Sequence, residues 1–309
     1  MSHLSFDQKV RVVSCLVEGN SVRSTERLCA IHRDTILRHL VQIGEGCQRL
    51  HDALFVGLHC NLLELDEVWS YLGKKQKRVR PEDPAAFGDQ YVFTAIDANR
   101  KAIVSYAIGK RDGKTAGAFA LDLRRRVVNR PQISTDGFKP YLEAIETAFG
   151  GAVPYAMIFK EYGKDEEDDQ RWYSPPKCIA SEKRRVSGNP DMDKVSTSYI
   201  ERSNLTLRMG CRRFTRLTNG YSKKLQNHAA AVGLHIAYYN LCRVHETLRA
   251  TPAQALAVAD RAWGVDELVE VALSLASEGE SMEGGILPAH VQGAAKEADR
   301  QLSLFPAWG

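Results

Sequence analysis

The sequence predicts an α/β protein in which helices flank a mixed five-stranded sheet and an all-α head precedes that sheet. Two patterns support this prediction. Apolar residues recur at helical spacing through the first 43 residues, whereas residues 61–159 alternate strand-type segments with amphipathic segments. At 309 residues the chain is long enough for two domains and a sizeable core.

Composition favours a soluble cytoplasmic protein. No apolar run approaches the length of a membrane span, so no membrane partner is expected. The seven cysteines include no CxxC pair, which favours a reducing compartment. Residues 202–245 contain eight Lys or Arg and no acid, whereas residues 265–309 contain eight acids and two basic residues. The middle of the chain is therefore expected to bind a polyanion, and the acidic tail to be separate from it.

The head, residues 1–50, is predicted to contain three short helices. Apolar spacing gives a helix over residues 5–18, Ser21 can cap a second helix through Leu28, and a third runs from about Arg33 to Ile43. The four-residue turn before the third helix is typical of a helix-turn-helix. Three polar residues on that helix would meet base edges or phosphates: Thr35, Arg38 and Gln42. A helical bundle that contacts only protein is the alternative.

The same turn contains Cys29 and His32, which have the spacing of metal ligands. Cys47 and Cys60 follow, but no second CxxC or HxxxH motif completes a zinc site. Buried structural thiols are the simpler interpretation, and a zinc site is the alternative.

A catalytic domain is predicted over residues 60–263, after a linker at 44–59. Its elements are a strand at 61–73, an antiparallel hairpin at 91–97 and 102–108, a helix at 115–128, a strand at 132–135, a helix at 140–149 and a strand at 153–159. This βββαβαβ order predicts the five-stranded mixed sheet.

Beyond the sheet, the sequence predicts a polar insertion and further helices. Residues 162–194 are interpreted as a long loop or small insertion. Helices are predicted at 196–209, 225–242 and 251–263, and residues 264–309 as a short helix followed by a disordered acidic tail.

Three acids occupy positions that such a sheet can bring together: Asp66 in the first strand, Asp136 at the end of the fourth, and Glu201 on the helix after the insertion. Carboxylate oxygens suit Mg²⁺ or Mn²⁺. Two such ions about 4 Å apart could activate a water or a 3′-hydroxyl and stabilise the leaving oxygen. Glu67 is expected on the opposite face of the strand, as a surface or salt-bridge residue.

Three segments resemble the catalytic blocks of bacterial insertion-sequence transposases of the DDE type, closest to the insertion-sequence-one type. They are LDEVWSYLG (65–73), STDGFKPY (134–141) and YIERSNLTLR (199–208), in the family order. The resemblance covers roughly residues 60–250. It implies an RNase H-like fold and assigns metal binding and catalysis to the matching Asp66, Asp136 and Glu201. The polar insertion and the long tail depart from the family pattern.

The resemblance implies a DNA transposase, associated with the nucleoid, that binds the terminal inverted repeats of its element. It would cleave a phosphodiester at each end and join the 3′-hydroxyl to target DNA, using Mg²⁺ or Mn²⁺. Handling two ends together implies a homodimer or larger synaptic assembly. The alternatives are a metal-dependent DNA nuclease of the same fold and a helix-turn-helix regulator with an inactive domain. The presence of all three acids disfavours the regulator.

Further DNA contacts are expected near the acids. Asn204 and Arg208 share a helix face with Glu201. Several basic residues would follow a phosphate backbone: Lys74, Lys75, Arg78, Arg212, Arg213, Arg216, Lys223 and Lys224. For the run at 74–80, a solvated loop is an equal alternative.

The end of the tail resembles the short peptide with which bacterial replication and repair proteins bind the DNA polymerase sliding clamp. The segment is QLSLFP, residues 301–306. Gln301 would contact the pocket rim, and Leu302, Leu304 and Phe305 would be the apolar anchors. Docking of Leu304 and Phe305 on the protein's own catalytic domain is the alternative.

Overall fold

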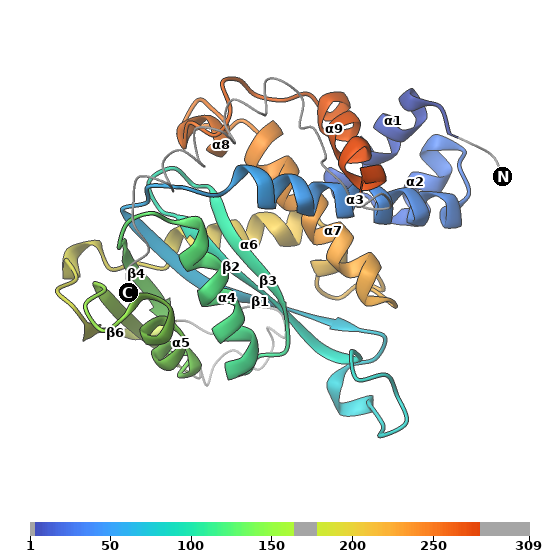
Figure 1. Ribbon diagram of the computed structural model, residues 1–309. Coiled ribbons are helices and arrows are strands. Elements are labelled where there is room, and N and C mark those ends of the chain that lie inside the picture. Colours follow the sequence, from blue (N-terminus) through green and yellow to red (C-terminus); the bar gives the residue numbers. More distant parts are fainter. Residues whose placement is uncertain (1–3, 164–177, 279–309) are drawn as a thin grey trace.

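The computed structural model describes residues 4–163 and 178–278. A six-stranded mixed sheet lies at its centre, with the strand order β3-β2-β1-β4-β5-β6 (Figure 1). β1 pairs antiparallel with β2 and parallel with β4, and β4 pairs parallel with β5. The strands are β1 (Leu62–Leu72), β2 (Gly88–Asp97), β3 (Ile103–Gly109), β4 (Gln132–Asp136), β5 (Tyr155–Tyr162) and β6 (Cys178–Ser187).

Helices cover both faces of this sheet. α4 (Gly113–Arg126) and α5 (Pro140–Phe149) pack together on one face, and α6 (Ser198–Gly210) crosses β1 on the other (Figure 1). The start of α4 is fixed locally, because the Asp112 carboxylate accepts a hydrogen bond from the N–H of Thr115 at 2.8 Å. A proline in the first turn likewise begins α5.

The remaining helices form a layer beside the sheet. α3 lies between α7 and α9, and α9 also packs against α1, so the head is joined to elements from the other end of the chain (Figure 1). These helices are α1 (Phe6–Val17), α2 (Val22–Cys29), α3 (Arg33–Leu54), α7 (Leu225–Ala237, continued by a wide turn through Cys242), α8 (Pro252–Ala255) and α9 (Val265–Glu278).

α3 is longer than predicted, and the linker predicted at 44–59 is wrong over most of its length. Glycines at 44 and 46 weaken the helical signal in the sequence. In the fold they allow close packing: a Cβ on Gly44 would collide with Ala230 of α7, and one on Gly46 with Ala272 of α9. Tertiary contact therefore outweighs intrinsic helix propensity at these positions.

Residues 4–163 and 178–278 contribute six strands to the sheet, whereas the sequence predicts five. β6 lies in the polar insertion and pairs with β5 alone, at the edge of the sheet. Its side chains are almost all exposed, so no apolar alternation marks it in the sequence. The helix predicted at 251–263 is also wrong, because α8 ends at Ala255 and Ala257 has a positive φ of 58°. The βββαβαβ order of the earlier elements is confirmed.

No helix in the described part of the chain is both long and apolar enough to cross a membrane. The short helix predicted after residue 264 corresponds to α9. The sliding-clamp residues Gln301, Leu302, Leu304 and Phe305 lie outside the described residues.

Candidate active site

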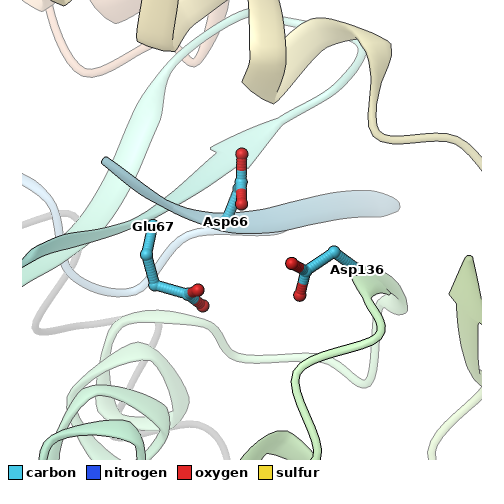
Figure 2. Close-up of side chains that lie close together, drawn as sticks. All are labelled: Asp66, Glu67 and Asp136. Atoms are coloured by element: carbon cyan, nitrogen blue, oxygen red, sulfur yellow. The ribbon is translucent and has the colours of Figure 1, made fainter. Parts of the chain in front are cut away.

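Two aspartates lie side by side where two parallel strands meet. The pairing of β1 with β4 ends at Leu65 opposite Thr135, so Asp66 and Asp136 occupy the next positions. Figure 2 shows Asp66 on one side of β1, Glu67 on the other, and Asp136 beside both. One carboxylate oxygen from each of these acids lies within 4.8 Å of the others. Within residues 4–163 and 178–278, no other three His, Cys, Asp or Glu side chains come so close together.

Asp66 is held in an environment that opposes its charge. Burial is the largest cause that raises its pKa, to about 7, and the neighbouring charges of Glu67, Asp136 and Glu201 add to it. The side chain of Asn204 on α6 donates a hydrogen bond to Asp66 Oδ2 at 2.8 Å. A divalent cation beside the carboxylate would relieve this repulsion, and three oxygen ligands suit Mg²⁺ or Mn²⁺.

Removing the Asp66 charge should stabilise the protein at alkaline pH. Because folding raises this pKa from 3.8 to about 7, the native state binds the proton more tightly, and stability falls as pH rises between those values. We expect Asp66→Asn to increase the free energy of unfolding by about 2–4 kcal/mol at pH 8 without divalent cations. This gain should shrink towards pH 4. Urea unfolding measures it, with the exposed Asp260→Asn as control. A variant less stable than wild type at pH 8 would contradict the prediction.

Glu67 forms the salt bridge that the sequence predicts, but it is not a surface residue. The predicted salt bridge exists, since Arg111 Nε lies 2.9 Å from Glu67 Oε2. The side chain is not on the surface, however, because only 1% of it is exposed. Burial is the first cause that raises the pKa of Glu67, followed by the charge of Asp136. Its Oε1 is buried, and the neighbouring Tyr141 hydroxyl, like Arg111, favours the charged carboxylate and opposes this rise in pKa.

Arg111 is the counter-charge of this acidic cluster. Its Nη2 lies 3.4 Å from Asp136 Oδ2, while its Nε contacts Glu67, and the guanidinium lies over the ring of Phe138 at 4.1 Å. One arginine thus bridges two of the three acids. It balances charge that a metal ion would also balance, so the two cations compete for the same carboxylates.

Arg111→Gln should therefore strengthen the binding of a divalent cation. Removal of a positive charge at this distance is expected to lower the Mn²⁺ dissociation constant at least about tenfold. Calorimetric titration of Mn²⁺ into the full chain measures the effect, and Arg125→Gln on the exposed face of α4 is the matched control. Unchanged or weaker binding by Arg111→Gln would show that this arginine does not compete with the metal.

Glu201 lies near these three acids but outside the group. Its carboxylate is about half exposed, accepts a hydrogen bond from Thr197 Oγ1 at 2.8 Å, and forms an ion pair with Lys160 of β5. It still contributes to raising the pKa of Asp66, which places its charge on the same side of the site. The structure brings Asp66 and Asp136 together directly and leaves Glu201 alongside, paired with a lysine.

Glu64 is a positioning residue that the sequence interpretation missed. Its buried carboxylate accepts hydrogen bonds from the backbone N–H groups of Tyr199 and Ile200, at 2.8 and 2.9 Å. These donors lie in the first turn of α6, where backbone N–H groups lack helical partners. Glu64 therefore fixes the start of α6 across β1. The sequence contains one indication of this role, because Glu64 lies two residues before Asp66 and therefore on the same face of the strand.

The predicted DNA contacts on α6 lie beside the acids. Asn204 is buried and bonded to Asp66. Burial lowers the pKa of the Arg208 guanidinium, and so does the nearby Arg216, whereas Asp66 acts in the opposite direction. Arg208 and Arg216 therefore form a positive edge next to the carboxylates.

Other predicted contacts are distributed over the surface. Arg38 and Gln42 are exposed on α3, and Thr35 is half-buried. Lys74 is paired with Asp83 at 2.6 Å, whereas Lys75 and Arg78 are exposed on the loop that extends from β1 to β2 (Figure 1).

Arg213 differs from its prediction. The neighbouring Arg212 is half-buried and Arg216 is exposed, so both side chains are accessible to a phosphate. The Arg213 guanidinium is instead largely buried, which lowers its pKa, and its Nη1 donates to Ser222 Oγ at 2.9 Å. Its guanidinium is therefore less accessible than the sequence predicts for a backbone contact.

The alternative zinc site is not assembled in the described part of the chain. Cys29 Sγ lies 3.9 Å from Cys15 Sγ, and Cys47 and Cys60 are fully buried. None of these thiols, nor His32, belongs to a group of three potential ligands there. The arrangement agrees with structural thiols.

No protein-family model matches the chain, and no curated protein matches it. A solved structure of a piggyBac transposase synaptic complex with hairpin DNA is similar at 11% sequence identity and a TM-score of 0.37. The alignment covers 90% of this chain and 62% of that chain, so this chain spans less than two thirds of that neighbour. A TM-score this low does not establish a shared fold.

Proposed function

We propose that the protein is a DNA transposase of the DDE type, closest to the insertion-sequence-one type, with an RNase H-like catalytic domain. The observation that carries the proposal is the acidic cluster where β1 and β4 meet, with ligand oxygens within 4.8 Å of one another. The sheet supports the RNase H-like assignment, because three antiparallel strands are followed by the parallel strands β4 and β5.

In this proposal Asp66 and Asp136 hold the metal, with Glu67 and Glu201 on either side. Bound Mg²⁺ or Mn²⁺ would supply an activated water or 3′-hydroxyl and charge stabilisation at the leaving oxygen. Asn204 orients the Asp66 carboxylate through its hydrogen bond, and Glu64 holds α6 in place. The positive edge formed by Arg208 and Arg216 would attract the phosphate to be cut.

We assign the head to recognition of the terminal inverted repeats, through α3. Arg38→Ala should weaken binding to the repeat by about 1–3 kcal/mol if Arg38 contacts a base. Fluorescence anisotropy with repeat and random duplexes measures this. Equal loss on both duplexes would identify a phosphate contact, and no loss on either would reject the helix-turn-helix role.

A metal-dependent nuclease with the same acids is the second candidate, because the cluster alone does not decide whether water or a 3′-hydroxyl attacks. The test uses DNA that flanks the coding sequence, pre-cut to expose a 3′-hydroxyl, together with a supercoiled target and Mg²⁺. A transposase joins the end to the target covalently. A protein that only nicks either DNA is a nuclease, and one that does neither is not a phosphoryl transferase.

Synapsis of two ends would need a homodimer or larger assembly. Binding of the sliding clamp through Gln301, Leu302, Leu304 and Phe305 also stays a prediction.

A further inference from the structure

A groove of about 1080 Å³ lies between the head and the segment that follows α6. α1, α2 and α3 line one wall, and residues 210–227 with the adjoining part of α7 line the other. The wall residues include Leu40 and Leu234, which give it an apolar part. The groove therefore connects two regions for which the sequence predicts separate DNA contacts.

The groove is strongly positively charged. Its lining includes seven Lys or Arg side chains and a single carboxylate, Asp34. Both walls contribute: the head supplies Arg23, Arg33 and Arg38, and the opposite wall supplies Arg212, Lys223 and Lys224. All but Arg212 are exposed. A cavity with this lining attracts a polyanion.

Close backbone packing holds the two walls in place. Gly19 has a φ of 77°, and a Cβ there would collide with the carbonyl oxygen of Met209 at the end of α6. Gly233 of α7 lies against Gly44 of α3 in the same way. These contacts leave no room for a side chain, so the backbones of the head and the catalytic body approach closely at both points.

Arg213 adds a second sign of an anionic occupant. It lines the groove, yet its Nη2 is buried with no hydrogen-bond partner. The other terminal nitrogen of Arg213, Nη1, donates a hydrogen bond to Ser222 Oγ. Ser222 Oγ also lies 3.1 Å from His228 Nδ1, and His228 Nε2 lies 3.3 Å from Ser70 Oγ on β1. A chain of hydrogen bonds thus joins the groove to the strand that contains Asp66.

We propose that this groove holds one phosphate backbone of the DNA duplex on which the protein acts, so that the head and the catalytic body contact the same DNA. The choice of DNA as the polyanion rests on the proposed function. Charge complementarity favours it, since a duplex presents a regular row of phosphates to cations on both walls. An acidic protein segment is the competing occupant.

The test compares two double variants of the full chain, one for each wall. Arg23→Gln with Arg33→Gln removes two cations from the head, and Lys223→Gln with Lys224→Gln removes two from the body. Binding of a duplex about one helical turn long is measured by anisotropy at several salt concentrations. Each double variant should reduce the slope of log affinity against log salt by about 2. Arg125→Gln with Arg130→Gln, which lie outside the groove, is the matched control.

Lysine acetylation followed by mass spectrometry locates the contact. The duplex should protect Lys223 and Lys224, whereas polyglutamate should leave both reactive. Slopes equal to the control for either wall would overturn the shared groove, and protection by polyglutamate alone would make it a protein-binding surface. These outcomes are separable from the proposed function, because strand transfer by the wild-type protein and its loss in Asp136→Asn are measured without any groove variant.

Discussion

Asp66→Asn and Asp136→Asn should each reduce DNA cleavage and joining by more than about 100-fold while leaving duplex binding nearly unchanged. Replacing partners of metal ligands typically costs 10–100-fold, and loss of a direct ligand costs more. Each substitution preserves the shape of the side chain and removes a charge from the cluster whose oxygens lie within 4.8 Å. Gel assays of cleavage and strand transfer in Mg²⁺ measure the loss, and anisotropy measures DNA binding.

Two further variants compare how much Glu201 and Glu67 contribute to activity. Glu201→Gln is also expected to abolish cleavage and joining, whereas Glu67→Gln should weaken activity in a way that added Mn²⁺ partly restores. The exposed Asp260→Asn is the matched control. Near-normal joining by Asp66→Asn, Asp136→Asn or Glu201→Gln would remove that residue from the site.

Glu64→Ala should be the most destabilising single substitution near the site. It leaves two backbone donors without their acceptor: the part-buried N–H group of Tyr199 and the buried N–H group of Ile200. Each such donor costs about 1–3 kcal/mol, so the free energy of unfolding should fall by about 2–5 kcal/mol. Activity should fall as well, because α6 carries Asn204 and Glu201.

Glu64→Gln is the matched variant for this prediction. Its amide oxygen can still accept both hydrogen bonds, so urea unfolding should show a much smaller loss than for Glu64→Ala. If both substitutions destabilise equally, the charge of Glu64 matters more than its hydrogen bonds. If neither does, the start of α6 is fixed by other contacts.

The sequence was most informative where local pattern and burial agree. β1, the β2–β3 hairpin and α5 follow from alternation, turn residues and helical spacing, and the proximity of Asp66 to Asp136 follows from their places on neighbouring strands. α3 beyond Gly44 and strand β6 could not be predicted, since close packing against α7 and pairing with a strand edge produce them.

Glu67 shows why part of the site was missed. Alternation along a strand correctly places its side chain on the face opposite Asp66 (Figure 2). Asp136, however, ends β4 and lies within reach of both faces of β1, so the two neighbours approach the same third acid. Strand pattern alone does not contain that information. Glu64 was missed for a related reason, because its partners are backbone groups 135 and 136 residues away.

Direct measurement of Mn²⁺ binding shows whether these carboxylates hold a divalent cation. Electron paramagnetic resonance counts free Mn²⁺ during titration of wild type, Asp136→Asn and Asp260→Asn, with and without duplex DNA. We expect saturable binding by wild type and Asp260→Asn, and its loss in Asp136→Asn under both conditions. Equal binding by all three proteins, or no saturable binding by wild type even with DNA, would contradict it.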